Sequence, residues 1–437
     1  MKAVLIAGAG SGCGKTTVTL GLMAAFREKG LRVQGFKAGP DYIDPSLHRV
    51  VTGLPSINLD TWMMSEPFLR YSFASRAADI SVIEGVMGLH DGRLPDSDEG
   101  STAELAKRLG LPVILVVNAQ SMARTAAAVI KGIREFDREV NIIGIILNKL
   151  GSGRHREILE KSIKEYCNLP VLGGVLRDAG LELPSRHLGL FMGEELPQEK
   201  IRLISVAAQI DLDKILELSY FCCPEPSPPF SEPVEDKGRV AVARDRAFCF
   251  YYQDNLDILE KLGYRLVEFS PLESSALPDN ITAVYLGGGY PELYARELSE
   301  NRPLLYALRS ASLKGTDIYG ECGGLIYLGE SLTTVEGEEY AMSGCLPCRT
   351  RMRHKLKSLG YVEIRPRENH WVLNRDQPVR GHAFHYSDLE FTGSALPNIY
   401  TGEPENKAVG YRRGNTLASY VHLHFSGLLC YTDTAEI

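Results

Sequence analysis

A glycine-rich loop between an apolar strand and a helix is the feature that most constrains this chain. Residues Val4–Ala7 predict a buried strand, and the sequence Ala9-Gly-Ser-Gly-Cys-Gly-Lys-Thr16 follows it. Glycines let backbone N–H groups approach phosphate oxygens, and the next helix adds its N-terminus. In this pattern the lysine reaches the β- and γ-phosphates and the threonine hydroxyl binds Mg²⁺. We therefore predict a nucleoside triphosphate site at Gly12, Gly14, Lys15, Thr16 and Thr17.

The composition indicates a globular chain of more than one domain. Its 437 residues exceed what one hydrophobic core usually serves. A net charge of −7 argues against nucleic acid or a membrane surface as a partner. No stretch approaches the ~18 apolar residues that a membrane-spanning helix needs. Nine scattered cysteines are typical of reduced thiols, so we expect a cytoplasmic protein.

A proline-rich stretch predicts a boundary between two domains. Residues 222–237 carry five prolines and no hydrophobic periodicity, which is typical of an extended linker. On both sides, apolar runs alternate with amphipathic stretches, which indicates an α/β fold with doubly wound parallel sheets. The predicted strands before the linker are Val4–Ala7, Arg32–Phe36, Ile80–Glu84, Pro112–Val117 and Ile142–Leu147. Those after it are Arg239–Ala243, Tyr264–Glu268, Ala283–Leu286 and Asp317–Tyr319, with a more β-rich tail from Val362.

Polar residues follow several predicted strands of the first half, where doubly wound folds bind ligands. Glu84 closes an apolar run and is a candidate Mg²⁺ ligand, with Asp41 a second candidate. Asn148 ends the fifth strand, where its amide could read a purine edge. Structural explanations stay open, because an Asp near a strand end often caps a helix.

The second half carries an amidotransferase signature around Cys322. An apolar strand runs into Gly-Glu-Cys-Gly-Gly, which predicts a sharp turn that exposes the cysteine as a nucleophile. We expect the following helix N-terminus to lower the pKa of the thiol. The glycine turn at Gly287–Gly289 could supply an oxyanion donor at Gly289. Cys345 and Cys348 have zinc-like spacing, but no second Cys/His pair is suitably placed.

Two histidines compete for the role of the catalytic base. Glutaminases of this class end their triad with His-Pro-Glu, in which the glutamate orients the imidazole. That pattern puts the base at His422 and replaces the glutamate with His424. Both side chains point to the same side of a strand, so spacing alone does not exclude His424. The sequence favours His422 and leaves the orienting carboxylate missing.

The chain resembles the cobyrinic acid a,c-diamide synthases along essentially its whole length. The resemblance rests on six segments in order: Ala9–Thr17, Gly39–Pro45, Glu84–Gly92, Gly287–Glu292, Gly320–Gly324 and Ser419–Phe425. It implies a dethiobiotin-synthetase-like P-loop domain over 1–221, the linker 222–237, and a class I glutamine-amidotransferase-like domain over 238–437. One departure is Ala383, where an acidic residue is expected.

The resemblance also implies a reaction and its partners. ATP, with Mg²⁺, would phosphorylate the a and c acetates of a corrinoid, and ammonia from glutamine would displace the phosphate. Through the shared motifs, Tyr42, Ile43 and Asp91 would lie on the tetrapyrrole side. A related branch of the family amidates Ni-sirohydrochlorin in coenzyme F430 synthesis. These motifs do not distinguish that branch from the one that amidates a corrinoid. Free ammonia could replace glutamine, and a homodimer is left open.

Two other classes of function fit the sequence less well. A nucleotide-dependent tetrapyrrole carrier would need neither Lys15 nor Cys322. A ParA/MinD-like switch ATPase would carry an extra lysine five residues before Lys15, where this chain has Gly10. The basic run Arg351–Lys357 is a candidate for binding substrate carboxylates, although such runs are usually solvated surface.

Overall fold

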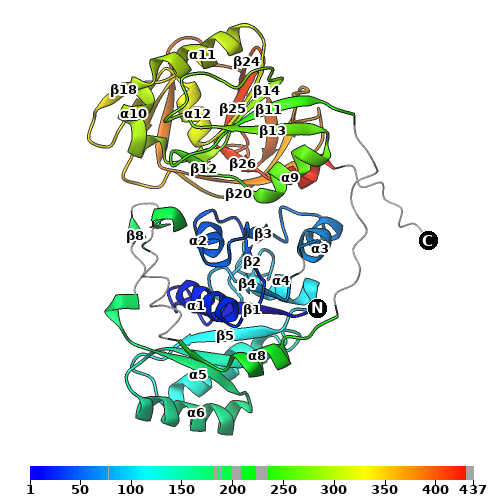
Figure 1. The fold of residues 1–437 in the computed structure, drawn as a ribbon, viewed down its shortest axis with the longest axis vertical. Helices are drawn as coiled ribbons and strands as arrows, with labels where there is room; N and C mark the ends of the chain where they lie inside the picture. Colours follow the sequence, from blue (N-terminus) through cyan, green and yellow to red (C-terminus); the bar gives the residue numbers. More distant parts are fainter. Residues whose placement is uncertain are drawn as a thin grey trace, which may run out of the picture. The chain divides into compact units, whose positions relative to one another are not determined.

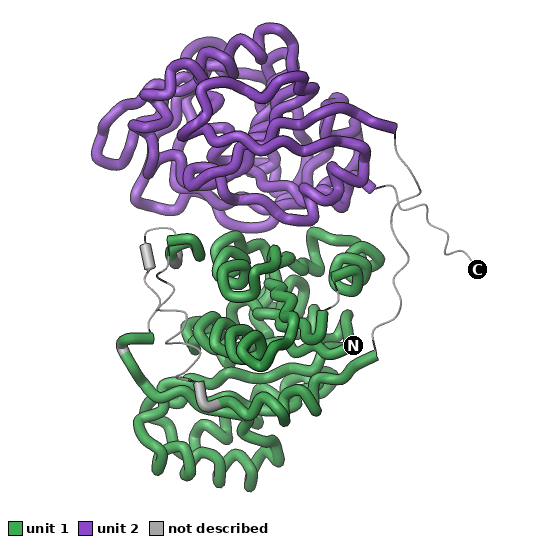
Figure 2. The backbone as a smooth tube through the Cα atoms, viewed as in Figure 1, with its two compact units in different colours: residues 1–228 green, residues 229–437 purple. Residues whose placement is uncertain are grey.

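The chain forms two compact units, residues 1–228 and 229–437 (Figure 2). The computed structural model describes residues 1–76, 78–181, 185–186, 189–195, 197, 208–222 and 235–429 (Figure 1). Most of the predicted linker, 222–237, lies outside the described residues. No helix in the described ranges is long and apolar enough to cross a membrane.

Unit 1 is built on an eight-stranded sheet in the order β10-β7-β6-β5-β1-β4-β2-β3. The strands pair in parallel, except that β10 runs antiparallel to β7. Their bounds are β1 Ala3–Gly8, β2 Val33–Ala38, β3 Ile57–Leu59, β4 Ile80–Glu84, β5 Val113–Asn118, β6 Ile142–Leu150, β7 Val171–Leu176 and β10 Ala208–Ile210. The predicted parallel sheet is confirmed, and β3, β7 and β10 are additional strands.

The helices of unit 1 follow the strands in alternation, as a parallel sheet requires. They are α1 Lys15–Glu28, α2 Ile43–Thr52, α3 Glu66–Ala74, α4 Thr102–Leu109, α5 Arg124–Phe136, α6 Gly153–Cys167 and α8 Leu212–Leu218. Short elements are η1 Ala179–Leu181, β8 Ser185–Arg186, β9 Gly189–Leu190 and η2 Gly193–Glu195. Apolar residues of α1 and of β1, β4 and β5 share one buried core. The loop after β1 lies where the strand order changes direction, the usual ligand position in such sheets.

Unit 2 combines an α/β sheet with two smaller β-sheets. The first sheet has the order β13-β11-β14-β16-β25-β24, and only β24 runs antiparallel to its neighbour. Its strands are β11 Gly238–Ala243, β13 Tyr264–Phe269, β14 Ala283–Leu286, β16 Asp317–Glu321, β24 Gly410–Arg413 and β25 Thr416–Ser419. The four predicted strands of this half are therefore present.

The β-rich tail of unit 2 is also present. One antiparallel sheet contains β20 Ser358–Pro366, β21 Val379–His385, β23 Tyr400–Glu403 and β26 Val421–Leu423. A mixed sheet, in which β17 runs parallel to β19, contains β17 Ser331–Thr333, β18 Glu339–Ala341, β19 Cys348–Met352 and β22 Ser387–Phe391. A short pair joins β12 Phe248–Phe250 to β15 Gly288–Gly289. The helical elements are α9 Gln253–Lys261, η3 Pro291–Tyr294, α10 Ala295–Glu300, α11 Arg302–Leu313, α12 Gly323–Leu328 and η4 Phe425–Leu428.

Candidate active site

The loop between β1 and α1 has the backbone of a phosphate-binding loop. Gly12 and Gly14 have φ values of 72° and 92°, a left-handed conformation that favours glycine. A Cβ on Gly14 would lie 1.9 Å from Nδ2 of Asn148, so a side chain does not fit there. Asn148 in turn donates from Nδ2 to the carbonyl of Cys13 at 2.9 Å. The loop is therefore packed closely against Asn148 and braced from β6.

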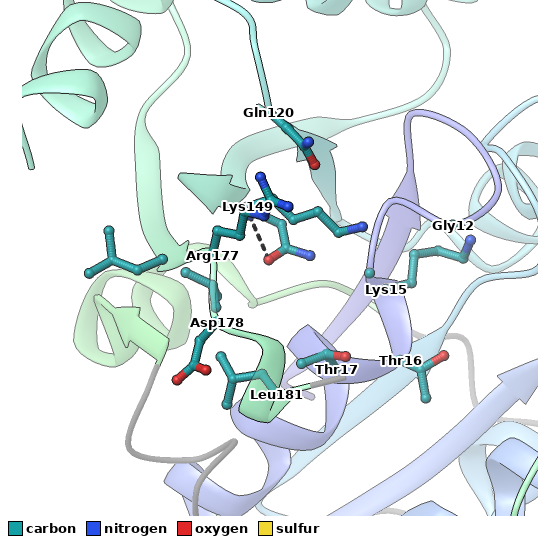
Figure 3. Close-up of a pocket in the computed structure, with 13 residues that line it drawn as sticks. Gly12, Lys15, Thr16, Thr17, Gln120, Lys149, Arg177, Asp178 and Leu181 are labelled. Atoms are coloured by element: carbon teal, nitrogen blue, oxygen red, sulfur yellow. Dashed lines mark hydrogen bonds between the residues drawn. The ribbon is translucent and has the colours of Figure 1, made fainter. Parts of the chain in front are cut away.

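A cavity of about 440 Å³ borders this loop (Figure 3). Its lining includes all six residues that the sequence predicts as nucleotide ligands: Gly12, Gly14, Lys15, Thr16, Thr17 and Asn148. Sequence reasoning missed the polar side chains that complete it: Gln120, Lys149, Arg177 and Asp178. These residues come from the ends of β5, β6 and β7, so only the strand order brings them to the loop. Asn148 accepts from the N–H of Lys149 at 2.8 Å, and its reading of a purine stays a prediction.

Glu84 lies fully buried beneath the phosphate loop and is surrounded by hydrogen-bond donors. The hydroxyl of Thr16 donates to its Oε1 at 2.6 Å, and Nε2 of His48 lies 2.8 Å from its Oε2. Nζ of Lys37 is 3.4 Å from Oε1. Burial would raise the pKa of Glu84, but Lys37, His48 and Thr16 outweigh it and hold that pKa below its usual range. The carboxylate therefore stays ionised beside the threonine hydroxyl.

Lys37 was missed by sequence reasoning and has three carboxylates around it. It forms an ion pair with Asp44, and its Nζ is 3.8 Å from Oδ2 of Asp41. Burial would lower the pKa of Lys37, but Asp44, Glu84 and Asp41 outweigh it and raise that pKa above its usual range. Asp41 also accepts from the N–H groups of Ile43 and Asp44 at 2.8 and 3.0 Å, and so caps α2.

The donor set allows a test of the predicted magnesium site. The described residues contain no group of three or more His, Cys, Asp or Glu side chains arranged to hold a metal ion. The hydroxyl of Thr16 and the carboxylate of Glu84 are adjacent, and such oxygens suit Mg²⁺ when phosphates and water complete its coordination. These two residues therefore fit the ion. Asp41 serves as a helix cap here, and its part as a ligand stays a prediction.

The segment after β4 lies against the phosphate loop. Lys15 donates from Nζ to the carbonyl of Met87. The N–H of Gly88 donates to Oδ2 of Asp91 at 2.9 Å, and a Cβ on Gly88 would lie 3.3 Å from Cα of Gly10. Asp91 is thus close to the phosphate loop. The predicted substrate residues Tyr42 and Ile43 lie at the start of α2, next to Asp41.

In unit 2, Cys322 occupies the sharp turn that its glycine neighbours predict. It connects β16 to α12 with φ 48° and ψ −95°, a strained conformation for a residue with a side chain. The expected lowering of its pKa is wrong for this structure. Burial, with Glu292 nearby, raises the pKa of Cys322 to about 12, and the N–H of Gly323 opposes this only in part. Desolvation therefore outweighs the pKa-lowering effect that we expected from the N-terminus of α12, which has only six residues.

Glycines connect this turn to His422. A Cβ on Gly323 would lie 3.1 Å from the backbone nitrogen of Gly289. A Cβ on Gly288 would lie 2.4 Å from Cε1 of His422. The segment Gly288–Gly289, which contains the predicted oxyanion donor, therefore lies against both the nucleophile turn and His422. The ring of His422 stacks on His382, with ring centroids 5.0 Å apart.

His424 has different surroundings. Its Nδ1 is 2.8 Å from Oγ of Ser426 and accepts from the N–H of Ser426 at 3.3 Å, so it caps η4. Its Nε2 is 4.0 Å from a carboxylate oxygen of Asp254. Burial lowers the pKa of His424 to about 3 and moves that of His422 well below its usual range. Both imidazoles are neutral at pH 7, and the geometry favours His422 as the base.

The basic run Arg351–Lys357, a predicted site for substrate carboxylates, is partly neutralised by an acidic side chain. Nε of Arg353 and Nζ of Lys357 lie 2.7 and 2.8 Å from the two carboxylate oxygens of Asp388. Asp388 reaches them because β19 pairs with β22, a contact that the local sequence does not reveal. Two of the cations thus already have an anionic partner.

Each unit matches a domain model of known proteins. Residues 4–191 match the model of the CobQ/CobB/MinD/ParA nucleotide binding domain, and residues 239–428 match that of the CobB/CobQ-like glutamine amidotransferase domain. Relatives named cobyrinate a,c-diamide synthase come from Listeria innocua (42% identical, 97% of this chain, 96% of the relative) and Priestia megaterium (41%, 97% and 94%). Another, from Salmonella typhimurium, is 42% identical over 97% of this chain and 95% of its own. The chain belongs to the cobyrinate a,c-diamide synthase family.

Proposed function

We propose that this chain is a glutamine-hydrolysing cobyrinate a,c-diamide synthase. It amidates the a and c acetate carboxylates of a tetrapyrrole, with ATP as the energy source and glutamine as the nitrogen donor. The observation that carries the proposal is the presence, in one chain, of two sites. One is a phosphate loop above the Thr16–Glu84 pair, and the other is a strained Cys322 beside His422.

The first half of the reaction activates the carboxylate. A carboxylate is a poor acyl donor at neutral pH, so the γ-phosphoryl group of ATP is transferred to it to give an acyl phosphate. Lys15 and the loop amides bind and orient the phosphates, while Thr16 and Glu84 would hold Mg²⁺, which would neutralise phosphate charge. Lys37 and His48 keep Glu84 ionised for that task.

The second half releases ammonia from glutamine. Sγ of Cys322 attacks the side-chain amide, and His422 takes the thiol proton and passes it to the leaving nitrogen. Because burial raises the pKa of Cys322 to about 12, the resting thiol is neutral and needs this base. The N–H of Gly289 is the candidate oxyanion donor. Water then hydrolyses the thioester, and the ammonia displaces phosphate from the acyl phosphate.

The tetrapyrrole site rests on Tyr42, Ile43 and Asp91. Tyr42 and Ile43 lie at the start of α2, and Asp91 lies in the segment after β4 that contacts the phosphate loop. The names of the relatives favour cobyrinate over Ni-sirohydrochlorin. A carrier or a switch ATPase has no use for the strained Cys322, so neither alternative is retained.

A direct assay tests this function. The purified chain is incubated with cobyrinate, ATP, Mg²⁺ and glutamine, and the tetrapyrrole is analysed by mass for conversion of two carboxylates to amides. Parallel reactions omit ATP, replace glutamine with ammonium chloride, or offer Ni-sirohydrochlorin. Amide formation that does not require ATP, or ATP consumption without any amide, would contradict the proposal. Faster turnover of Ni-sirohydrochlorin would assign the chain to the other branch.

A further inference from the structure

A buried carboxylate that the mechanism above does not use stands directly before the nucleophile. Glu321 is the last residue of β16 and is 1% exposed. Its Oε2 accepts from the hydroxyl of Tyr285 at 2.9 Å, and its Oε1 accepts from the hydroxyl of Tyr319 at 2.9 Å. Oε1 also accepts from the backbone N–H of Leu423 at 3.0 Å. Burial of a carboxylate is costly without such bonds, so this constellation is a built feature of the unit.

Leu423 lies between the two histidines, and buried side chains hold both of its backbone groups. Its N–H donates to Glu321, and its carbonyl accepts from Nδ2 of Asn255 at 2.7 Å. Oδ1 of Asn255 also accepts from the N–H of Phe425 at 2.7 Å. Asn255 belongs to α9 and is fully buried. Side chains from β16 and α9 thus grip β26, in addition to its pairing with β21.

The grip fixes the place of the neighbouring imidazole. In a strand, fixing the backbone of one residue also fixes the direction of the next side chain. The ring of His422 has little freedom to adapt, because Gly288 and His382 lie against it. A catalytic base displaced by ~1 Å loses about 100-fold in rate. The backbone position of Leu423 therefore controls whether His422 can serve Cys322.

We propose that Glu321 and Asn255 are positioning residues of the glutaminase reaction, which clamp the backbone of Leu423 and thereby hold His422 toward Cys322. The inference rests on the proposed function and extends it. Where related glutaminases place a glutamate two residues after the base, this chain has His424, which caps η4. The clamp supplies through the backbone the orientation that a carboxylate would otherwise give through the ring.

Four variants of the full-length chain test the clamp. Glu321→Leu and Asn255→Leu remove its two ends, whereas Glu321→Gln keeps an oxygen that can accept from Leu423. Tyr319→Phe is the matched control, because it removes a donor to Glu321 and leaves both clamp bonds in place. Each variant is assayed for kcat and KM of glutamine hydrolysis, for amidation driven by ammonium chloride, and for alkylation of Cys322 by iodoacetamide. Thermal unfolding checks that unit 2 is folded.

The two Leu variants should lose about 100-fold in glutaminase kcat, with KM changed less than about threefold. Their alkylation rate should fall to that of His422→Ala, because the thiol loses its base. Glu321→Gln should stay within about tenfold of the natural chain and Tyr319→Phe within about threefold. Ammonia-driven amidation should persist in all four.

Two results would overturn the clamp alone. One is full glutaminase kcat in both Leu variants. Another is a loss in Glu321→Gln as large as in Glu321→Leu, since the charge and not the backbone acceptor would then matter. If Glu321→Leu does not fold, Asn255→Leu and Glu321→Gln decide between these outcomes. A natural chain that hydrolyses no glutamine would refute the proposed function and the clamp together, whereas active glutaminase with unaffected variants refutes the clamp alone.

Discussion

Replacing Gly288 by alanine should displace the proposed base without removing any catalytic group. A Cβ at this position would lie 2.4 Å from Cε1 of His422 and 3.3 Å from Cβ of Phe250. Ordinary contact between carbons begins near 3.4 Å, so the ring must move by about 1 Å. A shift of that size in a base costs about 100-fold in rate. Glutamine-dependent amide formation should therefore fall by about 100-fold in Gly288→Ala.

The assay follows amide formation on the tetrapyrrole with glutamine or with ammonium chloride as nitrogen donor. Activity with ammonium chloride should be unchanged, because acyl phosphate formation belongs to unit 1. Gly393→Ala is the matched control in the same unit, since a Cβ there meets nothing within 4 Å and the backbone needs no left-handed φ. If Gly288→Ala keeps full glutamine activity, His422 is not the base and His424 becomes the candidate.

The remaining predictions address both units. Lys15→Ala should abolish amidation with either nitrogen source, and retained activity with ammonium chloride would contradict the acyl phosphate. Cys322→Ser should lose glutamine-dependent synthesis by several orders of magnitude, and ammonia should restore it. Asp91→Asn should slow turnover or leave a singly amidated product while ATP binding, measured by calorimetry, persists. Burial lowers the pKa values of His382 and His424 to about 3. Below about pH 6.5 these histidines bind protons in the unfolded chain but not in the folded one, so stability falls with pH. The free energy of unfolding of unit 2, measured in urea, should therefore drop by roughly 1 kcal/mol per histidine between about pH 6.5 and 5.5.

The phosphate loop and the turn at Cys322 could be predicted from the sequence because each depends on a few neighbouring residues. The loop from Gly8 to Thr16 needs small residues where the backbone approaches a phosphate, and the positive φ values of Gly12 and Gly14 agree with that requirement. The turn at Cys322 likewise needs glycine on its far side. Such features depend on a few consecutive residues, so the sequence displays them without knowledge of the sheet order.

Contacts across strands could not be predicted in the same way. His48 lies 36 residues from its partner Glu84, and Glu321 lies 102 residues from Leu423. Each of these pairs depends on which strands become neighbours. Strand β7 was not predicted for a different reason, because Gly173 and Gly174 interrupt its apolar run. The pKa of Cys322 was misjudged because burial, which sequence does not measure, outweighs one short helix.

Burial is followed by opposite ionisation states at the two sites: Glu84 is charged and Cys322 is neutral. Beneath the phosphate loop, Lys37 and His48 compensate the cost of burying Glu84, so the carboxylate remains ionised and available to a cation. At Cys322 the N–H of Gly323 compensates burial only in part, and desolvation keeps the thiol protonated until a base acts. A neutral thiol is protected from unproductive reaction and becomes a nucleophile only when His422 is correctly placed. This dependence on placement makes the backbone clamp on Leu423 a condition for ammonia release.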